Sequence, residues 1–139
     1  KRQNPRVWIA DFHQVGIYPG TGKKEEVGTG KAKGTKLNFE MEAFSGDKEY
    51  LACLDELEEF AIACKPSVIM LQAGADCLEG DPLTMLNLSL KGYKKIVEAV
   101  VKLARDLCNG KLLAFGGGGY NVFNCVNAWQ VVIKLLSNL

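Results

Sequence analysis

Three short apolar runs, separated by segments with helical periodicity, constrain the fold of this 139-residue chain most strongly. They are VWIADF (7–12), SVIMLQ (67–72) and KLLAF (111–115), and the alternating run TKLNF (35–39) adds a further strand candidate. The three runs are apolar throughout, which is typical of strands in a parallel sheet that is covered on both faces. The sequence therefore predicts an α/β fold with three αβα layers and a mostly parallel sheet.

Three helices are predicted, and they run to about Cys64, to about Leu107 and over roughly 121–137. Ser45 or Asp47 is a suitable cap for the first helix, and Ser89 is a suitable cap for the second. The residues of the second helix that we expect to face the core are Ile96, Val100, Leu103 and Leu107. At this length, and with this steady alternation of strand and helix, residues 1–139 are expected to form a single domain.

Charge and composition exclude several classes of function. Seventeen basic and sixteen acidic side chains leave a net charge of +1, so the chain lacks the excess of positive charge that binding to a nucleic acid or an anionic membrane requires. No apolar run approaches the roughly 18 residues that a membrane span needs. Five cysteines form an odd number without a CxxC pair, so we expect reduced thiols and a cytoplasmic location.

Ligands of parallel sheets bind beyond the carboxyl ends of the strands. Three loops of this chain qualify: the loop with His13, the loop with Asp76, and the run GGGGY that ends at Tyr120. Each residue also has a plain structural interpretation, and the pattern alone favours Asp76 as a turn residue and His13 as a hydrogen-bonded strand end. Asp81, which precedes a proline, is expected to form a turn, and Tyr120 could simply pack over the last helix.

The glycine run does not match a nucleotide-binding motif. A GxGxxG pattern that begins at Gly116 or Gly117 would need glycine at positions occupied by Asn121 and Val122. The acidic residue expected about 20 positions later is also missing, because no Asp or Glu follows Asp106. The loop GTGKAKGTK likewise departs from the spacing of a phosphate-binding loop.

Three motifs in this order resemble the zinc-dependent histone deacetylase family, and its acetoin-utilization and acetylpolyamine branch in particular. They are YPGTG (18–22), LQAGADCLEGDPLTMLNLSLKG (71–92) and FGGGGYN (115–121). The resemblance extends from about Pro5 to Trp129. It implies an arginase-like α/β fold and hydrolysis of acetylated amines, such as acetyl-lysine or acetylpolyamines, at a zinc ion held by two aspartates and a histidine.

The resemblance also implies roles for individual residues. Asp76 matches the second aspartate ligand of the metal, and Tyr120 matches the tyrosine that donates a hydrogen bond to the oxyanion. The positions that match the walls of the acyl channel are Tyr18, Leu83, Gly118 and Gly119. His13 does not match either histidine of the catalytic pair. Asp11 stands where the family usually has a serine that helps to bind potassium, so the resemblance does not extend to this part of the potassium site.

The departures from the family indicate an incomplete site. The DxDxHHGxG stretch that carries the first metal ligands is missing, and the chain has one histidine where the family's zinc chemistry requires three. We therefore expect the C-terminal part of a deacetylase domain, inactive alone, with zinc bound only if a partner chain completes the site. The expected partner is an N-terminal half-domain polypeptide or a second copy of this chain, and not a nucleic acid or a membrane. The alternative is a truncated remnant that serves as a non-enzymatic interaction or assembly module.

Overall fold

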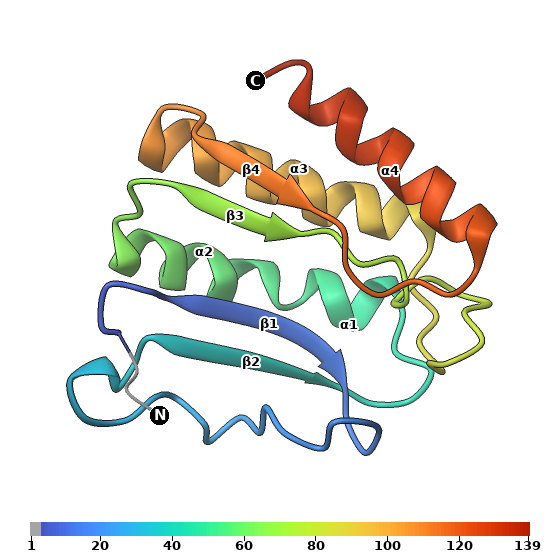
Figure 1. Ribbon diagram of the computed structural model, residues 1–139, viewed down its shortest axis with the longest axis horizontal. Helices are drawn as coiled ribbons and strands as arrows, with labels where there is room; N and C mark the ends of the chain where they lie inside the picture. Colours follow the sequence, from blue (N-terminus) through green and yellow to red (C-terminus); the bar gives the residue numbers. More distant parts are fainter. Residues whose placement is uncertain (1–3) are drawn as a thin grey trace.

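The computed structural model describes residues 4–139, in which parallel strands alternate with helices (Figure 1). In chain order the elements are β1 (Ile9–Gln14), the 3-10 helix η1 (Gly30–Ala32), β2 (Lys36–Met41), α1 (Asp47–Leu51), α2 (Leu54–Cys64), β3 (Ile69–Gln72), α3 (Leu90–Cys108), β4 (Leu112–Phe115) and α4 (Val122–Leu136). The predicted α/β fold with parallel strands is confirmed.

The strands form two separate two-stranded parallel sheets. β1 pairs with β2 from Ile9↔Lys36 to Gln14↔Met41, and β3 pairs with β4 from Ile69↔Leu112 to Gln72↔Phe115. All four strands run in the same direction, so their carboxyl ends lie at one end of the molecule (Figure 1). This arrangement brings the loops that follow β1, β3 and β4 towards one another.

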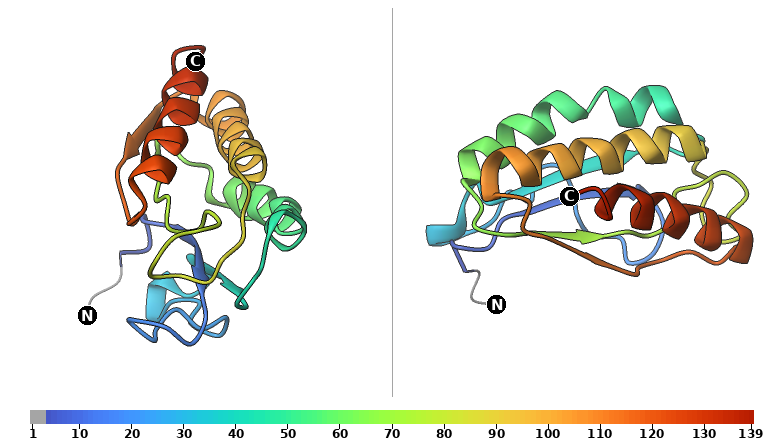
Figure 2. Two further views of the ribbon diagram at one scale, coloured as in Figure 1. Left: turned by 90° about the vertical axis from the view of Figure 1, so that its right-hand side faces the viewer. Right: turned by 90° about the horizontal axis from the view of Figure 1, so that it is seen from above.

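Only one face of the β3–β4 sheet is covered among residues 4–139. Figure 2 shows α3 on one side of β3 and β4. On the other side Met70 is 66% exposed, Leu113 54% and Phe115 46%, and the register places Met70 beside Leu113. These strands are apolar throughout, as the sequence analysis noted, but the part of the chain that the structure describes leaves their second face open.

The core lies between the strands and α1–α4. Phe12 stacks on Phe39 and on Tyr50, with ring centroids 4.3 Å and 5.6 Å apart. Along α3 the buried stripe is Tyr93, Val97, Val101, Ala104 and Cys108, together with Leu103. The predicted inward residues were right only in part, because Ile96, Val100 and Leu107 are half-buried. The helix is flanked by α1, α2 and α4 as well as β3, and these neighbours rotate and widen its buried face.

The first predicted helix is interrupted and forms α1 and α2. The Cys53 N–H bonds to the Tyr50 carbonyl in a tight turn, and the Cys53 thiol donates to the Glu49 carbonyl at 3.3 Å. Such local side-chain bonds compete with regular helix geometry. The N-cap of α1 is Gly46, whose N–H donates to Glu49 Oε2 at 3.0 Å. Ser89 caps α3 as predicted, because its hydroxyl accepts a hydrogen bond from the Gly92 N–H.

Candidate functional site

A cleft of about 410 Å³ lies at the carboxyl end of β1. Its lining includes Asp11, His13 and the Tyr18 loop on one side, and Asp76 and Thr84 on the other. The loops after β1 and β3 therefore meet, as the parallel topology predicts. Leu83 and Tyr120 are outside this lining, and both side chains are largely exposed, at 62% and 57%.

Asp76 lies directly against the glycine run. The Ala75 N–H donates to the Gly118 carbonyl at 2.7 Å, which joins the loop after β3 to the loop after β4. A Cβ added at Gly118 would lie 1.9 Å from Asp76 Oδ2, and one added at Gly117 would lie 1.9 Å from Gln72 Nε2. At Gly117 and Gly118 the absence of a side chain therefore leaves room for neighbouring side chains that approach the backbone closely.

The Asp76 carboxyl is half-buried, and burial raises its pKa above the ordinary aspartate value, with Asp81 adding a like charge nearby. No ion pair involves Asp76 among residues 4–139. The Thr84 hydroxyl donates a hydrogen bond to the Asp76 backbone carbonyl, which holds this loop in place. Asp76 also belongs to the lining of the cleft.

Tyr120 stands at the end of the glycine run, immediately before α4. Its N–H donates to Asp81 Oδ2 at 2.8 Å, and the following residue, Asn121, caps α4 by accepting from the N–H groups of Phe123 and Asn124. Asp81 is itself buried, with 7% exposure. The prediction that it forms a turn is confirmed, because its Oδ1 accepts from the Leu83 N–H at 2.9 Å.

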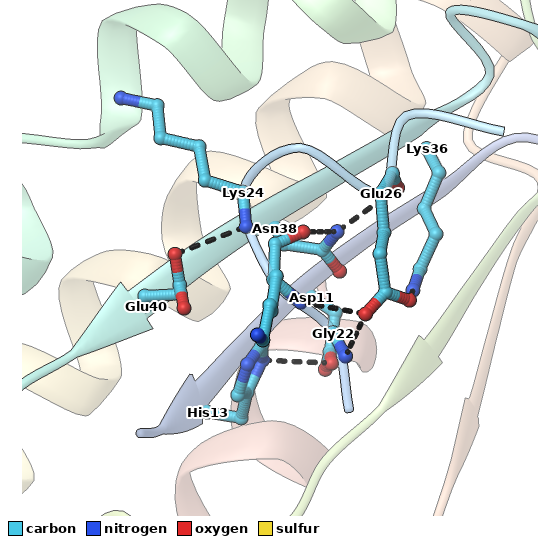
Figure 3. Close-up of polar contacts among 9 residues, drawn as sticks. Asp11, His13, Gly22, Lys24, Glu26, Lys36, Asn38 and Glu40 are labelled. Carbon is cyan, nitrogen blue, oxygen red and sulfur yellow. Dashed lines mark hydrogen bonds and ion pairs between the residues drawn. The ribbon is translucent and has the colours of Figure 1, made fainter. Parts of the chain in front are cut away.

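The long loop that carries Tyr18 is held by polar side chains of β2 (Figure 3). Asn38 is buried, and its Nδ2 donates to the carbonyls of Lys23 and Glu26 at 2.9 Å and 3.1 Å. Glu40 Oε2 accepts from the Lys24 N–H at 3.0 Å. Sequence analysis missed these anchors, because nothing local distinguishes the Asn and Glu of β2 from solvent-facing strand residues.

Glu26, which belongs to the same loop, forms further contacts that stabilise it. Its Oε1 accepts from the N–H groups of Gly22 and Lys23, and its Oε2 lies 3.6 Å from Lys36 Nζ (Figure 3). These bonds lower the pKa of the Glu26 carboxyl, and the hydrogen bond from the Lys23 N–H has the largest effect. The loop is therefore ordered around its anchors, whereas the Tyr18 side chain at its tip is 95% exposed.

His13 lies at the end of β1 beside Asp11, with 3.1 Å between His13 Nδ1 and Asp11 Oδ2 (Figure 3). Its ring also packs against Gly22, where an added Cβ would lie 2.8 Å from His13 Cε1. His13 Nδ1 is nevertheless a buried atom without a hydrogen-bond partner among the described residues, so the predicted hydrogen bond of this strand-end histidine is not observed. The ring instead packs against the loop at Gly22.

The residues present do not form a complete metal site. Across residues 4–139, no group of three or more His, Cys, Asp and Glu side chains is arranged to hold a metal ion. A protein zinc site needs about three side-chain ligands. Asp76 by itself therefore does not make a zinc site.

The fold and the site place this chain among α/β proteins that carry a carboxylate and a tyrosine on loops at the carboxyl ends of a parallel sheet. A comparison with known families matches residues 1–136 to the histone deacetylase domain. The chain belongs to the histone deacetylase family.

Similar proteins agree with this assignment. A probable deacetylase of Archaeoglobus fulgidus is 39% identical over 118 residues, which are 84% of this chain and 33% of that protein. The acetoin utilization protein AcuC of Bacillus subtilis is 38% identical over 130 residues, covering 91% of this chain and 34% of AcuC. The chain therefore spans about a third of the length of these curated relatives, and it is a partial deacetylase domain.

Solved structures show the same fold. The crystal structure of the HDA15 HD domain superposes with a TM-score of 0.85 at 31% identity, covering 97% of this chain and 39% of the other. The structure of the histone deacetylase Clr3 superposes with a TM-score of 0.87 at 24% identity, over 98% and 23% of the two chains. Separately, none of the helices in residues 4–139 is long and apolar enough to cross a membrane.

Proposed function

We propose that residues 1–139 are the C-terminal portion of one deacetylase domain and contribute Asp76 and Tyr120 to an amide-hydrolysing site. The observation that carries this proposal is the half-buried Asp76 packed against a glycine run that ends at Tyr120, in a chain that matches the histone deacetylase domain. The proposed substrates are acetylated amines, either acetyl-lysine or acetylpolyamines. The similarity to a probable deacetylase and to an acetoin utilization protein supports deacetylation, and the choice between these amines is left to experiment.

In this proposal the Tyr120 hydroxyl donates a hydrogen bond to the oxyanion that forms when the amide carbonyl is attacked. Tyr18, Leu83, Gly118 and Gly119 form walls of the acyl channel. Asp76 is one ligand of a zinc ion whose remaining ligands belong to another part of the domain. The 139-residue chain is then inactive alone, since three ligands and a general base are needed.

The proposed partner is the remainder of a deacetylase domain, supplied as a polypeptide that carries a DxDxHHGxG stretch. Two features support this proposal. The face of the β3–β4 sheet with Met70, Leu113 and Phe115 is apolar and open, and contiguous exposed apolar surface marks an interaction site. The two parallel sheets also present unpaired strand edges, which readily accept a further strand. A second copy of this chain is the competing occupant.

The test is to mix the chain with such a polypeptide and zinc, and to measure acetate release from an acetyl-lysine peptide and an acetylpolyamine. We expect turnover, and Tyr120→Phe should lower kcat by about 10²–10³-fold, the usual cost of losing one oxyanion donor. Tyr93→Phe is the matched control, because the Tyr93 hydroxyl is buried without a hydrogen-bond partner among the described residues. A partner that binds but supports no turnover would contradict the proposal.

The second candidate is a non-enzymatic assembly module in the cytoplasm. It is favoured by the exposed apolar residues of α4, where Val122 is 74% exposed and Phe123 80%. A cytoplasmic location is supported by the five cysteines, which are all free. This candidate predicts that the assembled complex binds no zinc and tolerates Asp76→Asn, whereas the deacetylase proposal predicts that Asp76→Asn abolishes zinc-dependent turnover.

A further inference from the structure

Asp81 connects the two loops that carry the proposed site. It is a buried carboxylate with 7% exposure, and both of its oxygens accept hydrogen bonds from the backbone. Oδ2 accepts from the Tyr120 N–H at 2.8 Å, across 39 positions of sequence. Oδ1 accepts from the N–H groups of Leu83 and Thr84 at 2.9 Å and 3.3 Å. A buried carboxylate with charge-assisted bonds on both oxygens is a strong fixed point.

We propose that Asp81 is the positioning residue of Tyr120: it fixes the backbone from which the tyrosine ring projects towards the substrate. This inference rests on the function proposed above. The chain before Tyr120 is four glycines, which have the greatest backbone freedom of any residue, and Gly119 has a φ of +141°. The hydrogen bond from the Tyr120 N–H to Asp81 restrains the backbone at Tyr120, where the flexible glycine run ends.

The same turn also reaches the proposed metal ligand. Thr84, whose N–H bonds to Asp81, donates its hydroxyl to the Asp76 backbone carbonyl. On the other side, Asn121 Nδ2 donates to the Gly80 carbonyl and Asn124 Nδ2 donates to the Glu79 carbonyl, each at 3.1 Å. These two amide contacts are exposed, whereas the Asp81 carboxylate is buried. The two loops are thus joined at several points, and the Asp81 carboxylate is the contact made to the backbone of Tyr120 itself.

The test compares Asp81→Asn with Glu79→Gln, a matched control whose side chain is exposed two positions away. Asparagine has the same shape as aspartate, but its NH₂ group cannot accept a hydrogen bond. One of the two sets of backbone N–H groups therefore loses its acceptor. In the complex with the completing polypeptide, we expect kcat to fall by about 10–100-fold with KM changed less than about twofold, because misplacement of a transition-state contact lowers kcat. Glu79→Gln should change neither value.

A double-mutant cycle separates positioning from general weakening of the fold. If Asp81 acts through Tyr120, adding Asp81→Asn to the Tyr120→Phe variant should change kcat by less than about twofold. Full additivity of the two losses would overturn the proposal. Circular dichroism checks that each variant is folded, and Asp81→Glu replaces Asp81→Asn if the latter unfolds, with the same expected loss since its carboxylate is displaced by one methylene.

A second readout does not depend on turnover. Amide hydrogen exchange followed by NMR on the 139-residue chain should show Tyr120 protected, and Asp81→Asn should speed its exchange by at least about tenfold while Val101 in α3 stays unchanged. Unchanged exchange at Tyr120 would overturn the proposed restraint. If the wild-type complex shows no turnover but the exchange result holds, the deacetylase proposal fails while the restraint by Asp81 stands.

Discussion

At the scale of single residues, the glycine run is explained by what lies against it. Gly117 and Gly118 leave room for the side chains of Gln72 and Asp76, whereas a Cβ at Gly116 would meet only Trp129 Cζ2 at an ordinary contact distance of 3.9 Å. The four glycines therefore differ in importance although they are identical in sequence. Gly118 matters most for the proposed site, because its neighbour is the proposed metal ligand.

The prediction for Gly118→Ala is a loss of metal affinity with little loss of stability. The added methyl would lie 1.9 Å from Asp76 Oδ2, the end of a side chain that can rotate away, so the fold tolerates the change but the carboxylate moves. We expect zinc affinity of the completed complex to fall by about 10–100-fold, as is usual when the support of a ligand is lost. Gly116→Ala is the control, and zinc titration that gives equal affinities for the two variants would show that Asp76 is not a ligand.

At the scale of secondary-structure elements, the first turn of α1 is tied to the first turn of α3. Asp47 Oδ1 accepts from the Ser89 N–H at 2.8 Å, and Asp47 Oδ2 accepts from the Ser89 hydroxyl at 2.7 Å. Gly92 leaves space for this carboxylate, since a Cβ there would lie 2.3 Å from Asp47 Oδ1. One aspartate thus supports a helix cap that lies 42 positions later in the sequence.

The Asp47–Ser89 connection predicts a pH-dependent stability. The Ser89 hydroxyl and then the Ser89 N–H lower the pKa of Asp47 below its ordinary value of 3.8. A depressed folded-state pKa stabilises the protein above the unfolded value, and that contribution disappears as the pH falls through the folded value. Asp47→Asn should therefore lower the free energy of unfolding by about 1–2 kcal/mol at neutral pH, and by less below the ordinary aspartate pKa.

Urea unfolding of Asp47→Asn at neutral pH and at a pH below the pKa of Asp47 measures this difference. Glu59→Gln, an exposed substitution on α2, serves as the control and should leave the free energy of unfolding within about 0.5 kcal/mol. An equal loss at both pH values would mean that the charge of Asp47 contributes nothing to the contact.

At the scale of the whole molecule, the apolar face of the β3–β4 sheet is the most conspicuous feature. Met70 and Leu113 are paired neighbours on it and are both more than half exposed. A sheet that is covered on one face only leaves apolar surface in water, which disfavours a lone monomer. We therefore propose this open face as the surface on which the expected partner packs.

Met70→Lys tests this surface. Because Met70 is 66% exposed, we expect the free energy of unfolding of the chain to change by only about 0.5 kcal/mol. Binding of the completing polypeptide should weaken by at least about tenfold, which is the effect of about 1.4 kcal/mol from one unpaired interface charge. Ile62→Lys, an exposed apolar site at 51% on α2, is the control, and calorimetry that finds equal weakening in both variants would contradict the assignment of this face. If Met70→Lys instead abolishes concentration-dependent self-association, the occupant is a second copy of the chain.

Sequence alone determined the features that depend on local patterns. Strand and helix alternation, the parallel class of sheet, the Ser89 cap and the turn at Asp81 follow from residues within a few positions of one another. The motifs around Asp76 and Tyr120 also identified the family.

Tertiary structure decided the features that join distant segments. The bond from Asp81 to Tyr120, the Asp47–Ser89 connection and the packing of Asp76 against Gly118 each span about 40 positions, and no local pattern specifies which backbone N–H or glycine a carboxylate will meet. The rotated face of α3 has the same origin, because packing against neighbouring elements outweighs the weak preferences of the segment.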